Sequence, residues 1–354
     1  MYLPASPLVS VIVPVWNAEP YLQRCLSSIL KQTLRDIEII CVNDASTDGS
    51  LKILEAAAAS DTRVQIINLR ENSGESAARN AALARARGSF IGSVDNDDDV
   101  DLNFFEELYT LAQKTGADIA KGTRLQYEPG RQPKIQDINS YVSKSKAYFT
   151  SQWWTAIYSR KLIENNSIDF PVGFPLNGDS LFLTKAVVCA NGVAVTDAVR
   201  YHYHRRLNSG NSMILSETKV TSFIETSSML LDYLNRNCGR LSDEEFDYMY
   251  CYNMIRLLSV VLREVAWAGQ KAATIHMAAE AAIRGFGACG RKEALSYRLS
   301  LTLPAVCAAL ANANRTLLES QLAGYGGMRA FTAEILRNRL HWPASMKQNW
   351  KLLP

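Results

Sequence analysis

An acidic cluster follows an apolar run near residue 90, and its residue types and spacing suit metal chemistry. The stretch FIGSVDNDDDVD has aspartate at five of seven consecutive positions: Asp95, Asp97, Asp98, Asp99 and Asp101. Carboxylates this close repel one another and raise each other's pKa. Alternate carboxylates such as Asp95 and Asp97 can hold Mg²⁺ or Mn²⁺, which prefer oxygen ligands. The alternative is a solvated acidic turn that leads into the next helix. In both interpretations we expect Asp99 to face water and Asp101 to cap that helix.

Polar residues also follow the first two apolar runs of the chain. VNDASTDGS places Asp44 directly after a buried run, where its carboxylate can accept a hydrogen bond from a base imide or a ribose hydroxyl. PVWNAE places Pro14, Asn17 and Glu19 after the first run, where the backbone can line a nucleotide base. The alternative for both segments is an ordinary strand-to-helix loop with capping residues. That alternative leaves Asp44 unexplained, which favours a functional role for it.

Three later segments carry further candidates, each with a structural alternative. Arg79 in ENSGESAARN can face a base or phosphate, or it can be a surface arginine. Asp179 in LNGDSLF can be a general base for a hydroxyl, or a helix N-cap. In YHYHRRLNSG, Arg206 and Ser209 suit a diphosphate, and His204 can add a metal or phosphate contact. A basic surface loop explains that last segment equally well.

The apolar periodicity predicts strands and helices in alternation, which must position these residues. In chain order the expected elements are strand 9–16, helix 18–33, strand 37–44, helix 46–60, strand 64–69, helix 73–88, strand 89–94, helix 102–116 and strand 117–123. Such βαβ units form a mainly parallel sheet, whose ligands bind beyond the carboxyl ends of the strands. We therefore expect Asp44 and the cluster from Asp95 to Asp99 to share one rim.

The rest of the chain has a less regular pattern. Residues 151–164 are aromatic and then helical, residues 174–192 form a loop that enters a helix, and residues 192–206 alternate like a strand. From about residue 216 the pattern is helical. We place a domain boundary near residue 215, so that residues 216–354 form a mostly helical C-terminal region.

Composition limits the class of protein and its location. The chain has 354 residues, of which 47% are hydrophobic and 21% charged, as in ordinary globular proteins. The seven scattered cysteines and four histidines form no zinc spacing. The odd number of cysteines and the lack of a disulfide framework favour a reducing compartment. The start has no basic region typical of a signal peptide, and no apolar run has membrane-spanning length, so we expect a cytoplasmic protein.

The net charge of +3 is unevenly distributed along the chain. Residues 281–354 hold ten Lys or Arg against three acidic residues, with Trp342 and Trp350 among them. This basic region can contact anionic lipid on the inner face of the plasma membrane, and the alternative is a solvated helical face. Acceptor binding and homo-oligomer formation are further roles open to the helical region. No nucleic-acid-binding motif accompanies the charge, so we expect no nucleic-acid partner.

The order of these motifs resembles the nucleotide-binding half of the family 2 glycosyltransferases. The match is carried by VSVIVPVWNAEPYLQRCLSSILKQT, IEIICVNDASTDGS, ENSGESAARNAALARARGSFI and VDNDDD, over about residues 8–110. A looser match, in SQWWTAIYSRKLIENNSIDFPVGF, NGDSLF and YHYHRRLNS, continues over about residues 111–215 and suggests an acceptor-binding half. It is nearest to bacterial enzymes that build lipopolysaccharide, capsule or other surface polysaccharide. The resemblance implies an α/β GT-A fold, a Rossmann-like and mainly parallel sheet flanked by helices, here with a C-terminal helical extension.

The resemblance also implies roles for the matching positions. Asp179 matches the catalytic base, and Gly178 stands where the family commonly has glutamate, a departure that concerns acceptor binding or tuning of the base. Asp97 matches the ligand of a divalent cation, Mn²⁺ or Mg²⁺, and Asp95 and His204 are further candidate ligands. The donor-binding set comprises Pro14, Asn17, Glu19, Asp44, Arg79, Asp95, Arg206 and Ser209.

The family's reaction is transfer of a sugar with inversion from a nucleotide-diphosphate donor, here expected to be a UDP-sugar, to a hydroxyl of a glycan or lipid-linked acceptor. Two alternatives remain at this point: a sugar nucleotidyltransferase, and a non-catalytic relative that binds nucleotide or glycan. The first normally has a Gly- and Arg/Lys-rich loop after its first strand, which PVWNAEPYL lacks. A Rossmann dehydrogenase is unlike this chain, because no G-x-G-x-x-G follows the first strand.

Overall fold

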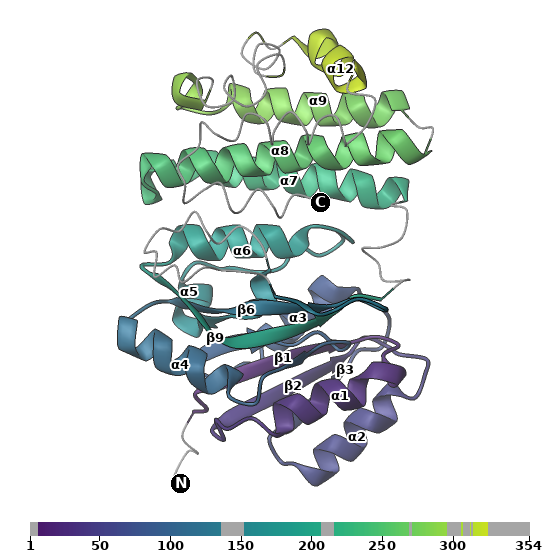
Figure 1. Cartoon of the computed structure of the whole chain (residues 1–354), viewed down its shortest axis with the longest axis vertical. Coiled ribbons are helices and arrows are strands. Elements are labelled where there is room, and N and C mark those ends of the chain that lie inside the picture. The colour runs from purple at the N-terminus through teal and green to yellow at the C-terminus, as the bar shows by residue number, and fades with distance from the viewer. Residues whose placement is uncertain are drawn as a thin grey trace. The chain divides into compact units, whose positions relative to one another are not determined.

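A computed structural model describes most of the chain as two compact units (Figure 1). The described residues are 6–135, 152–206, 216–268, 271–295, 306, 312 and 314–324, without the side chains of 259–273 and 321–324. The first unit comprises residues 1–144, 151–173 and 185–212. The second comprises residues 145–150, 174–184 and 213–354.

The first half of the first unit alternates strands and helices, as the sequence predicts. Its elements are β1 (Val9–Val15), α1 (Glu19–Leu30), β2 (Ile37–Asn43), α2 (Ser50–Ser60), β3 (Val64–Asn68), α3 (Glu75–Leu83) and β4 (Phe90–Ser93). The strands lie in the order β3-β2-β1-β4, and every pair among them is parallel. The register pairs Val15 with Asn43, so the loops after β1 and β2 leave the sheet side by side.

The second half extends the same sheet with mixed strand directions. Its elements are β5 (Asp99–Val100), α4 (Phe104–Thr115), β6 (Ile119–Tyr127), β7 (Lys134–Ile135), the 3-10 turn η2 (Trp153–Thr155), β8 (Ala156–Ser159), α5 (Arg160–Asn165) and β9 (Val193–His204). The sheet continues from β4 in the order β8-β6-β9-β5, with β7 beside β6. The strand β8 is antiparallel to both of its neighbours, whereas β6 and β9 are parallel. Neither β8 nor β5 is expected from the sequence, because such short segments show no measurable periodicity.

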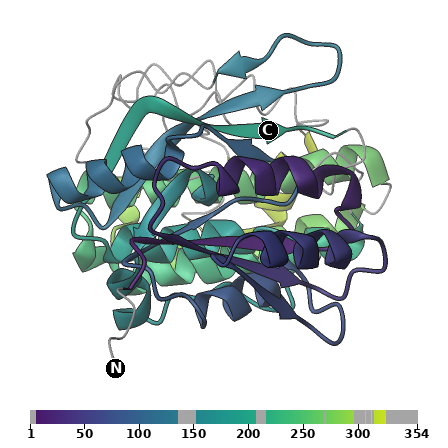
Figure 2. The same ribbon diagram turned by 90° about the horizontal axis from the view of Figure 1, so that it is seen from below.

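Helices flank the sheet on both faces, as Figure 2 shows for the strands β1 to β4. The core below α1 and α4 contains alternate residues of β1 together with apolar residues of the two helices: Val9, Val11, Val13, Val15, Leu22, Leu26, Phe104, Phe105 and Leu108. Gly92 of β4 permits close packing of α4, because a Cβ there would lie 2.6 Å from a ring carbon of Phe105. This packing fixes the ends of the strands, on which the candidate site depends.

The second unit is helical, in agreement with the helical extension expected from the sequence. Its helices are α7 (Glu217–Arg236), α8 (Asp243–Ala268), α9 (Lys271–Gly287) and α12 (Arg315–Gly324), and α7, α8 and α9 pack against one another. The helix α6 (Gly178–Cys189) begins in this unit. No helix in the described ranges combines the length and the apolarity that a bilayer crossing requires. Most of the basic region after residue 281 lies outside the described residues, so its contact with a membrane stays a prediction.

The buried carboxylate of Glu38 gives a test of the first unit's stability. Glu38 in β2 accepts hydrogen bonds from Ser10 Oγ (2.7 Å), from Gln65 Nε2 (2.9 Å) and from the backbone and guanidinium of Arg87. Burial alone would raise the pKa of Glu38, but the hydrogen bonds from Ser10 and Arg87 outweigh it and lower the pKa. We expect Glu38→Gln to lower the free energy of unfolding by about 2 kcal/mol at pH 7.

The pH dependence of this effect follows from the direction of the pKa shift. A depressed carboxyl pKa contributes stability above the unfolded value of about 4.3, and the contribution is lost as pH falls through the folded pKa. The difference between Glu38→Gln and the wild type in urea unfolding should therefore shrink below about pH 4. Glu164→Gln, which removes an exposed pair with Arg160, is the control and should cost less than about 1 kcal/mol. An equal loss of unfolding free energy in both variants would contradict the stabilising role of Glu38.

Candidate active site

The loops after β1 and β2 are joined by hydrogen bonds from residues that the sequence assigns to a donor site. Asn17 Oδ1 accepts from the backbone N–H of Thr47 (2.8 Å), and the N–H of Asn17 donates to Ser46 Oγ (3.1 Å). Glu19 Oε2 accepts from the N–H of Gly49 (2.8 Å), at the start of α2. Asn17 and Glu19 therefore brace one loop against the other and define the shape of this rim.

Asp44 holds a third loop to the same rim. It is 3% exposed, and its two carboxylate oxygens accept from the backbone N–H groups of Ser73 (2.7 Å) and Gly74 (2.9 Å). Gly74 has φ of +84°, a conformation that favours glycine, and it leads directly into α3. Each carboxylate oxygen can accept a second hydrogen bond, so Asp44 can still bind a ligand while it orders the loop.

Trp16 is a candidate site residue that sequence reasoning missed. Its side chain is 54% exposed although it directly follows the fully buried strand β1. The backbone N–H of Asp44 donates to the carbonyl of Val15 (2.8 Å), so Trp16 and Asp44 are neighbours across the two strand ends. The sequence feature that could have indicated Trp16 is a large aromatic residue at the carboxyl end of a parallel strand. From the sequence, only a backbone contact with a base is expected at that position.

Arg79 and Asp95 form an ion pair near the end of β4. Arg79 Nη2 lies 3.0 Å from Asp95 Oδ1 and 2.5 Å from Glu75 Oε1, and the guanidinium stacks over the ring of Trp153 at 4.7 Å. Burial raises the pKa of Asp95 to about 7, while the charge of Arg79 opposes that rise. The Asn96 amide donates to the carbonyl of Pro14 (2.8 Å), which ties the acidic cluster to the end of β1.

Asp97 and Asp98 come together with the end of β9. Asp97 forms an ion pair with Arg206, whose guanidinium also lies 4.7 Å from the ring centre of Tyr21. Asp98 is 1% exposed, and its Oδ1 accepts from the backbone N–H of His204 (2.7 Å). Asp98 Oδ2 has no hydrogen-bond partner among the described residues. Burial, with the charges of Asp97 and Asp95, raises the pKa of Asp98 to about 9.

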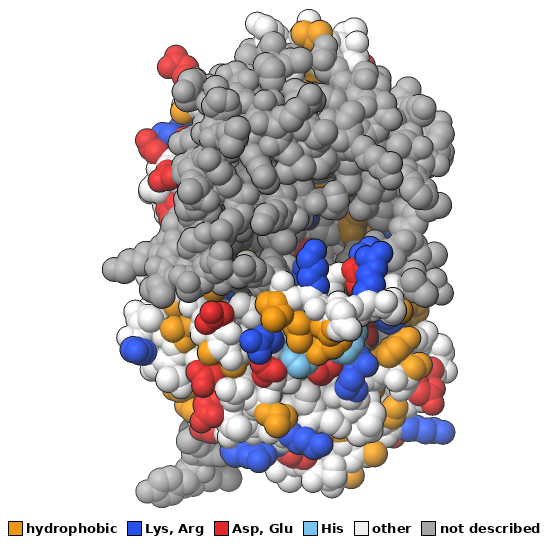
Figure 3. All heavy atoms as spheres, viewed as in Figure 1, with side chains coloured by type: hydrophobic (Ala, Val, Ile, Leu, Met, Phe, Trp, Pro, Cys, Tyr) orange, Lys and Arg blue, Asp and Glu red, His pale blue; other side chains and the backbone are white. Residues whose placement is uncertain are grey.

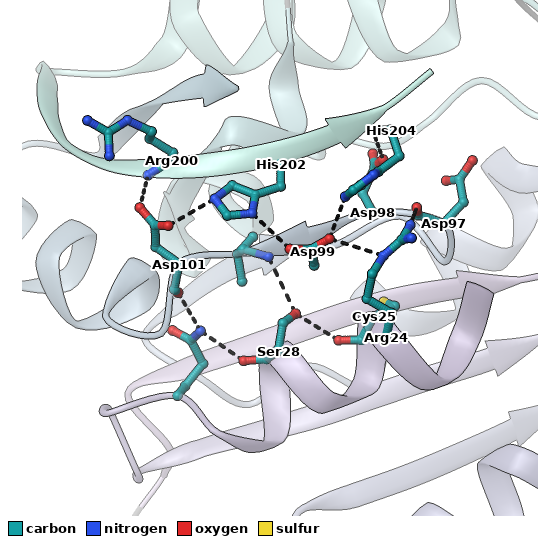
Figure 4. A network of polar contacts seen from close by, with 12 residues as sticks. Arg24, Cys25, Ser28, Asp97, Asp98, Asp99, Asp101, Arg200, His202 and His204 are labelled. Carbon is teal, nitrogen blue, oxygen red and sulfur yellow. Dashed lines mark hydrogen bonds and ion pairs between the residues drawn. The ribbon is translucent and has the colours of Figure 1, made fainter. Parts of the chain in front are cut away.

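A network of imidazoles and carboxylates fixes β5 against β9 and α1 (Figure 4). His202 Nδ1 lies 2.8 Å from Asp99 Oδ2, and His202 Nε2 lies 2.9 Å from Asp101 Oδ1. Asp99 Oδ1 contacts both His204 Nε2 (2.6 Å) and Arg24 Nε (3.1 Å). On the face viewed in Figure 3, histidine side chains reach the surface among acidic and basic ones.

The expectations for Asp99 and Asp101 were wrong. Asp99 does not simply face water, because two imidazoles and Arg24 engage it. Asp101 does not cap α4 with its side chain, because the N-cap position is Asn103 and the Asp101 carboxylate accepts from the N–H of Arg200 (2.8 Å) and contacts His202. The physical reason is the antiparallel pairing of β5 with β9, which aligns Asp99 with His202.

Electrostatics strengthen this network. Burial works to raise the pKa of Asp99, but the hydrogen bonds and charges of His202 and His204 outweigh it and lower the pKa. Burial similarly works to lower the pKa of His202, but Asp101 and Asp99 raise it to about 9. His202 is therefore cationic at neutral pH, and the network holds two charged carboxylates in place beside Asp97.

The acidic cluster fits a divalent cation shared with a substrate. No group of three or more His, Cys, Asp or Glu in the described ranges is arranged as a complete metal site. Mg²⁺ and Mn²⁺ bound with a nucleotide need only one or two protein carboxylates. Burial and mutual repulsion raise the pKa values of Asp95 and Asp98 and so disfavour their charged forms, and a bound cation would relieve that repulsion. Asp97 fits such a ligand, whereas the Nε2 atom of His204 is occupied by Asp99.

The remaining candidates lie elsewhere. Asp179 is in the first turn of α6, and its Oδ1 accepts from the N–H of Ser180 (2.8 Å). It belongs to the second unit, whereas Asp44, Asp95 and Arg206 belong to the first. Ser209 lies outside the described residues. Among the described residues, the predicted donor-binding residues thus lie in the first unit and Asp179 lies in the second.

The fold is that of the GT-A transferases, a curled α/β sheet flanked by helices. The chain is similar to residues 1–349 of TarS from S. aureus, solved in complex with UDP-GlcNAc, with a TM-score of 0.72 and 23% identity over 89% of this chain and 92% of that one. At this level of identity the similarity concerns the fold.

Sequence comparisons identify the family. A model described as glycosyl transferase family 2 matches residues 10–177. Two proteins of Bacillus subtilis named as glycosyltransferases are similar: EpsJ, 34% identical over 57% of this chain, and EpsH, 32% identical over 64%. The matched region covers 62% of EpsJ, which is less than two thirds of its length, and 72% of EpsH. This chain belongs to glycosyltransferase family 2.

Proposed function

We propose that this protein is an inverting glycosyltransferase that uses a UDP-sugar and a divalent cation. Its acceptor is a hydroxyl of a glycan or lipid-linked intermediate in bacterial surface polysaccharide synthesis. The observation that carries the proposal is the gathering of Asp44, Asp95, Asp97 and Arg206 at strand ends of one unit. Family membership and the UDP-GlcNAc complex of the structurally similar TarS support it.

The donor's parts have chemically suited partners. The exposed ring of Trp16 offers a flat apolar surface for a base, and Asp44 offers carboxylate oxygens for an imide or ribose hydroxyl. Arg206 supplies a guanidinium for the diphosphate, and its ion pair with Asp97 holds it near the carboxylates. Asp95, kept in place by Arg79, faces the ribose and sugar in this arrangement.

The transfer is a single displacement. Asp179 removes the proton from the acceptor hydroxyl as that oxygen attacks the anomeric carbon. Negative charge develops on the departing diphosphate, and Arg206 stabilises it electrostatically. A cation held by Asp97, with Asp95 as a further ligand, would supply Lewis-acid stabilisation of the same oxygens. No covalent intermediate on the protein is needed.

The proposal is tested by a thermal-shift panel of nucleotides and nucleotide sugars with and without MnCl₂. A ligand present at 100 times its Kd stabilises the folded state by about 2.7 kcal/mol, which a melting curve detects. We expect UDP and at least one UDP-sugar to raise Tm in the presence of Mn²⁺, and that sugar nucleotide to release UDP. Release of pyrophosphate from a nucleoside triphosphate and sugar phosphate, without UDP-sugar turnover, would contradict the proposal.

Trp16→Ala should weaken binding of UDP in this scheme. Stacking of a base on an aromatic ring contributes about 1–3 kcal/mol, so Kd should rise about 5- to 150-fold. Isothermal titration with UDP and Mn²⁺ measures the change. Leu102→Ala is the matched control, because Leu102 is also 54% exposed, in the same unit, and should leave Kd unchanged. An unchanged Kd for Trp16→Ala would remove this residue from the base site.

A further inference from the structure

The turn that precedes α6 is held by polar side chains of α7, all within the second unit. The backbone N–H of Leu176 donates to Ser222 Oγ (3.2 Å). The carbonyl of Leu176 accepts from the same Ser222 hydroxyl (3.2 Å) and from Thr226 Oγ1 (3.4 Å). Ser222 and Thr226 are buried and lie one turn apart on α7. The helix α7 therefore fixes the backbone three residues before Asp179.

Asn177 is the centre of this contact. It is 7% exposed and has φ of +68°, a left-handed conformation that non-glycine residues adopt only at a cost. Its amide nitrogen donates to Thr226 Oγ1 (3.2 Å) and Ser227 Oγ (3.3 Å). Its carbonyl oxygen Oδ1 accepts from Arg256 (3.2 Å). The side chain is thus bonded at both ends, and these bonds stabilise the backbone conformation from which α6 begins.

Arg256 of α8 bridges the two sides of Asp179. Its Nη2 donates to Asn177 Oδ1, and its Nη1 donates to Ser180 Oγ (3.0 Å). The guanidinium also lies over the rings of Phe223 (5.5 Å) and Tyr252 (5.8 Å), which restrict its position. In the part of the chain that the structure describes, no carboxylate forms an ion pair with Arg256. An arginine fork bonded to residues 177 and 180 fixes the geometry of the residue pair between them.

We propose that Arg256 and Asn177 are positioning residues for Asp179, so that α7 and α8 belong to the catalytic apparatus. The inference rests on the proposed function, which gives Asp179 the acceptor's proton. It gives the helical region a role in catalysis, whereas the sequence allows several roles for that region. A base displaced by about 1 Å from its reactive geometry can lose a factor of about 10² in rate without any loss of substrate affinity.

The test compares Arg256→Ala and Arg256→Lys with a matched control, Arg284→Ala. Arg284 of α9 also donates to a serine of α7, Ser228 (2.5 Å), but this contact does not involve the turn before α6. The probe is the UDP-sugar that releases UDP in the panel above, with Mn²⁺. We expect Arg256→Ala to lower kcat about 10- to 100-fold with donor KM changed less than about twofold. Arg256→Lys should recover part of kcat, because lysine keeps the charge but not the fork.

A double variant separates this inference from the proposed function. If Arg256 acts through Asp179, adding Arg256→Ala to Asp179→Asn should lower the residual rate less than about twofold, because the effects of coupled residues do not add. An Arg256→Ala kcat equal to that of Arg284→Ala, with Asp179→Asn inactive, overturns the inference and leaves the proposed function intact. Full activity of Asp179→Asn overturns the role of Asp179 itself, and the inference with it.

Hydrogen exchange tests the proposal without an activity measurement. It also uses Arg256→Lys, so the test remains valid if Arg256→Ala folds poorly. Hydrogen exchange of peptides that span residues 176–184 should accelerate about tenfold or more in Arg256→Ala and Arg256→Lys, relative to Arg284→Ala. Exchange in peptides of β1 and β2 should stay unchanged in all three variants. Unchanged exchange at residues 176–184 in both Arg256 variants would contradict the proposal.

Discussion

Asp179→Asn is expected to lower sugar transfer by about 10²–10⁴-fold, the range that a general base contributes, with little change in donor binding. Asparagine has nearly the same shape as aspartate but does not accept a proton at neutral pH. Its Oδ1 can still accept the N–H of Ser180, so the first turn of α6 should keep its geometry. Transfer measured at saturating donor and acceptor gives the rate, and isothermal titration with UDP and Mn²⁺ gives the affinity.

A second Asp→Asn change provides the control for this experiment. Asp169 is 65% exposed at its side chain and pairs with Lys185, and neither residue has a role in the proposed reaction. Asp169→Asn should retain the wild-type rate. Normal transfer by Asp179→Asn would mean that another group accepts the proton, whereas loss of UDP binding by this variant would show that Asp179 serves the donor instead.

Asp97→Ala is expected to abolish metal-dependent donor turnover, with a loss of about 10³-fold or more. The estimate follows because a catalytic cation supplies several kcal/mol of charge stabilisation, and each 1.36 kcal/mol corresponds to a factor of ten. The change also leaves Arg206 without its carboxylate partner at Asp97, so the diphosphate contact should weaken. Turnover against Mn²⁺ concentration, together with Mn²⁺ titration in the presence of UDP, measures both effects.

The thermal stability of Asp97→Ala shows whether its loss of turnover results from unfolding, because carboxylates crowd around Asp97. The charge of Asp97 is among the causes that raise the pKa of Asp95 and Asp98, so its removal relieves repulsion. Without metal, the Tm of Asp97→Ala should therefore equal or exceed that of the wild type, while stabilisation by Mn²⁺ and UDP is lost. Asp61→Ala, which removes an Asp–Arg pair at the end of α2, is the control and should keep Mn²⁺-dependent turnover. Unchanged turnover by Asp97→Ala would exclude Asp97 as a ligand.

The losses of activity expected for Asp97→Ala and Asp179→Asn arise in different units of the chain. Asp97 belongs to the first unit, where the contacts of β5 with β9 and of Asp99 with His202 hold the acidic cluster. Asp179 belongs to the second unit, where Asn177 and Arg256 hold the turn before α6. Donor affinity should therefore respond to changes in the first set of contacts, and kcat at saturating donor should respond to changes in the second.

Local sequence was sufficient to predict the parallel half of the fold and to propose part of the candidate site. Strands β1 to β4 and their helices follow from apolar periodicity, which depends only on neighbouring residues. Asp44 and Asp97 became candidate site residues because functional groups gather at the carboxyl ends of parallel strands. The predicted proximity of these ends is confirmed in part by the hydrogen bond from Asn96 to the carbonyl of Pro14.

Only the tertiary structure decided how the acidic cluster is divided among its partners. The sequence by itself determined that five aspartates follow β4. From the sequence, however, Asp99 was expected to face solvent and Asp101 to cap the next helix. Both carboxylates instead contact His202, about 100 residues away, because β5 pairs antiparallel with β9 in one register. The same holds for Arg256, whose bonds to Asn177 and Ser180 depend on how α8 packs in its unit. Periodicity describes the face that each element buries, whereas the register and packing between distant elements depend on the whole set of contacts in the folded chain.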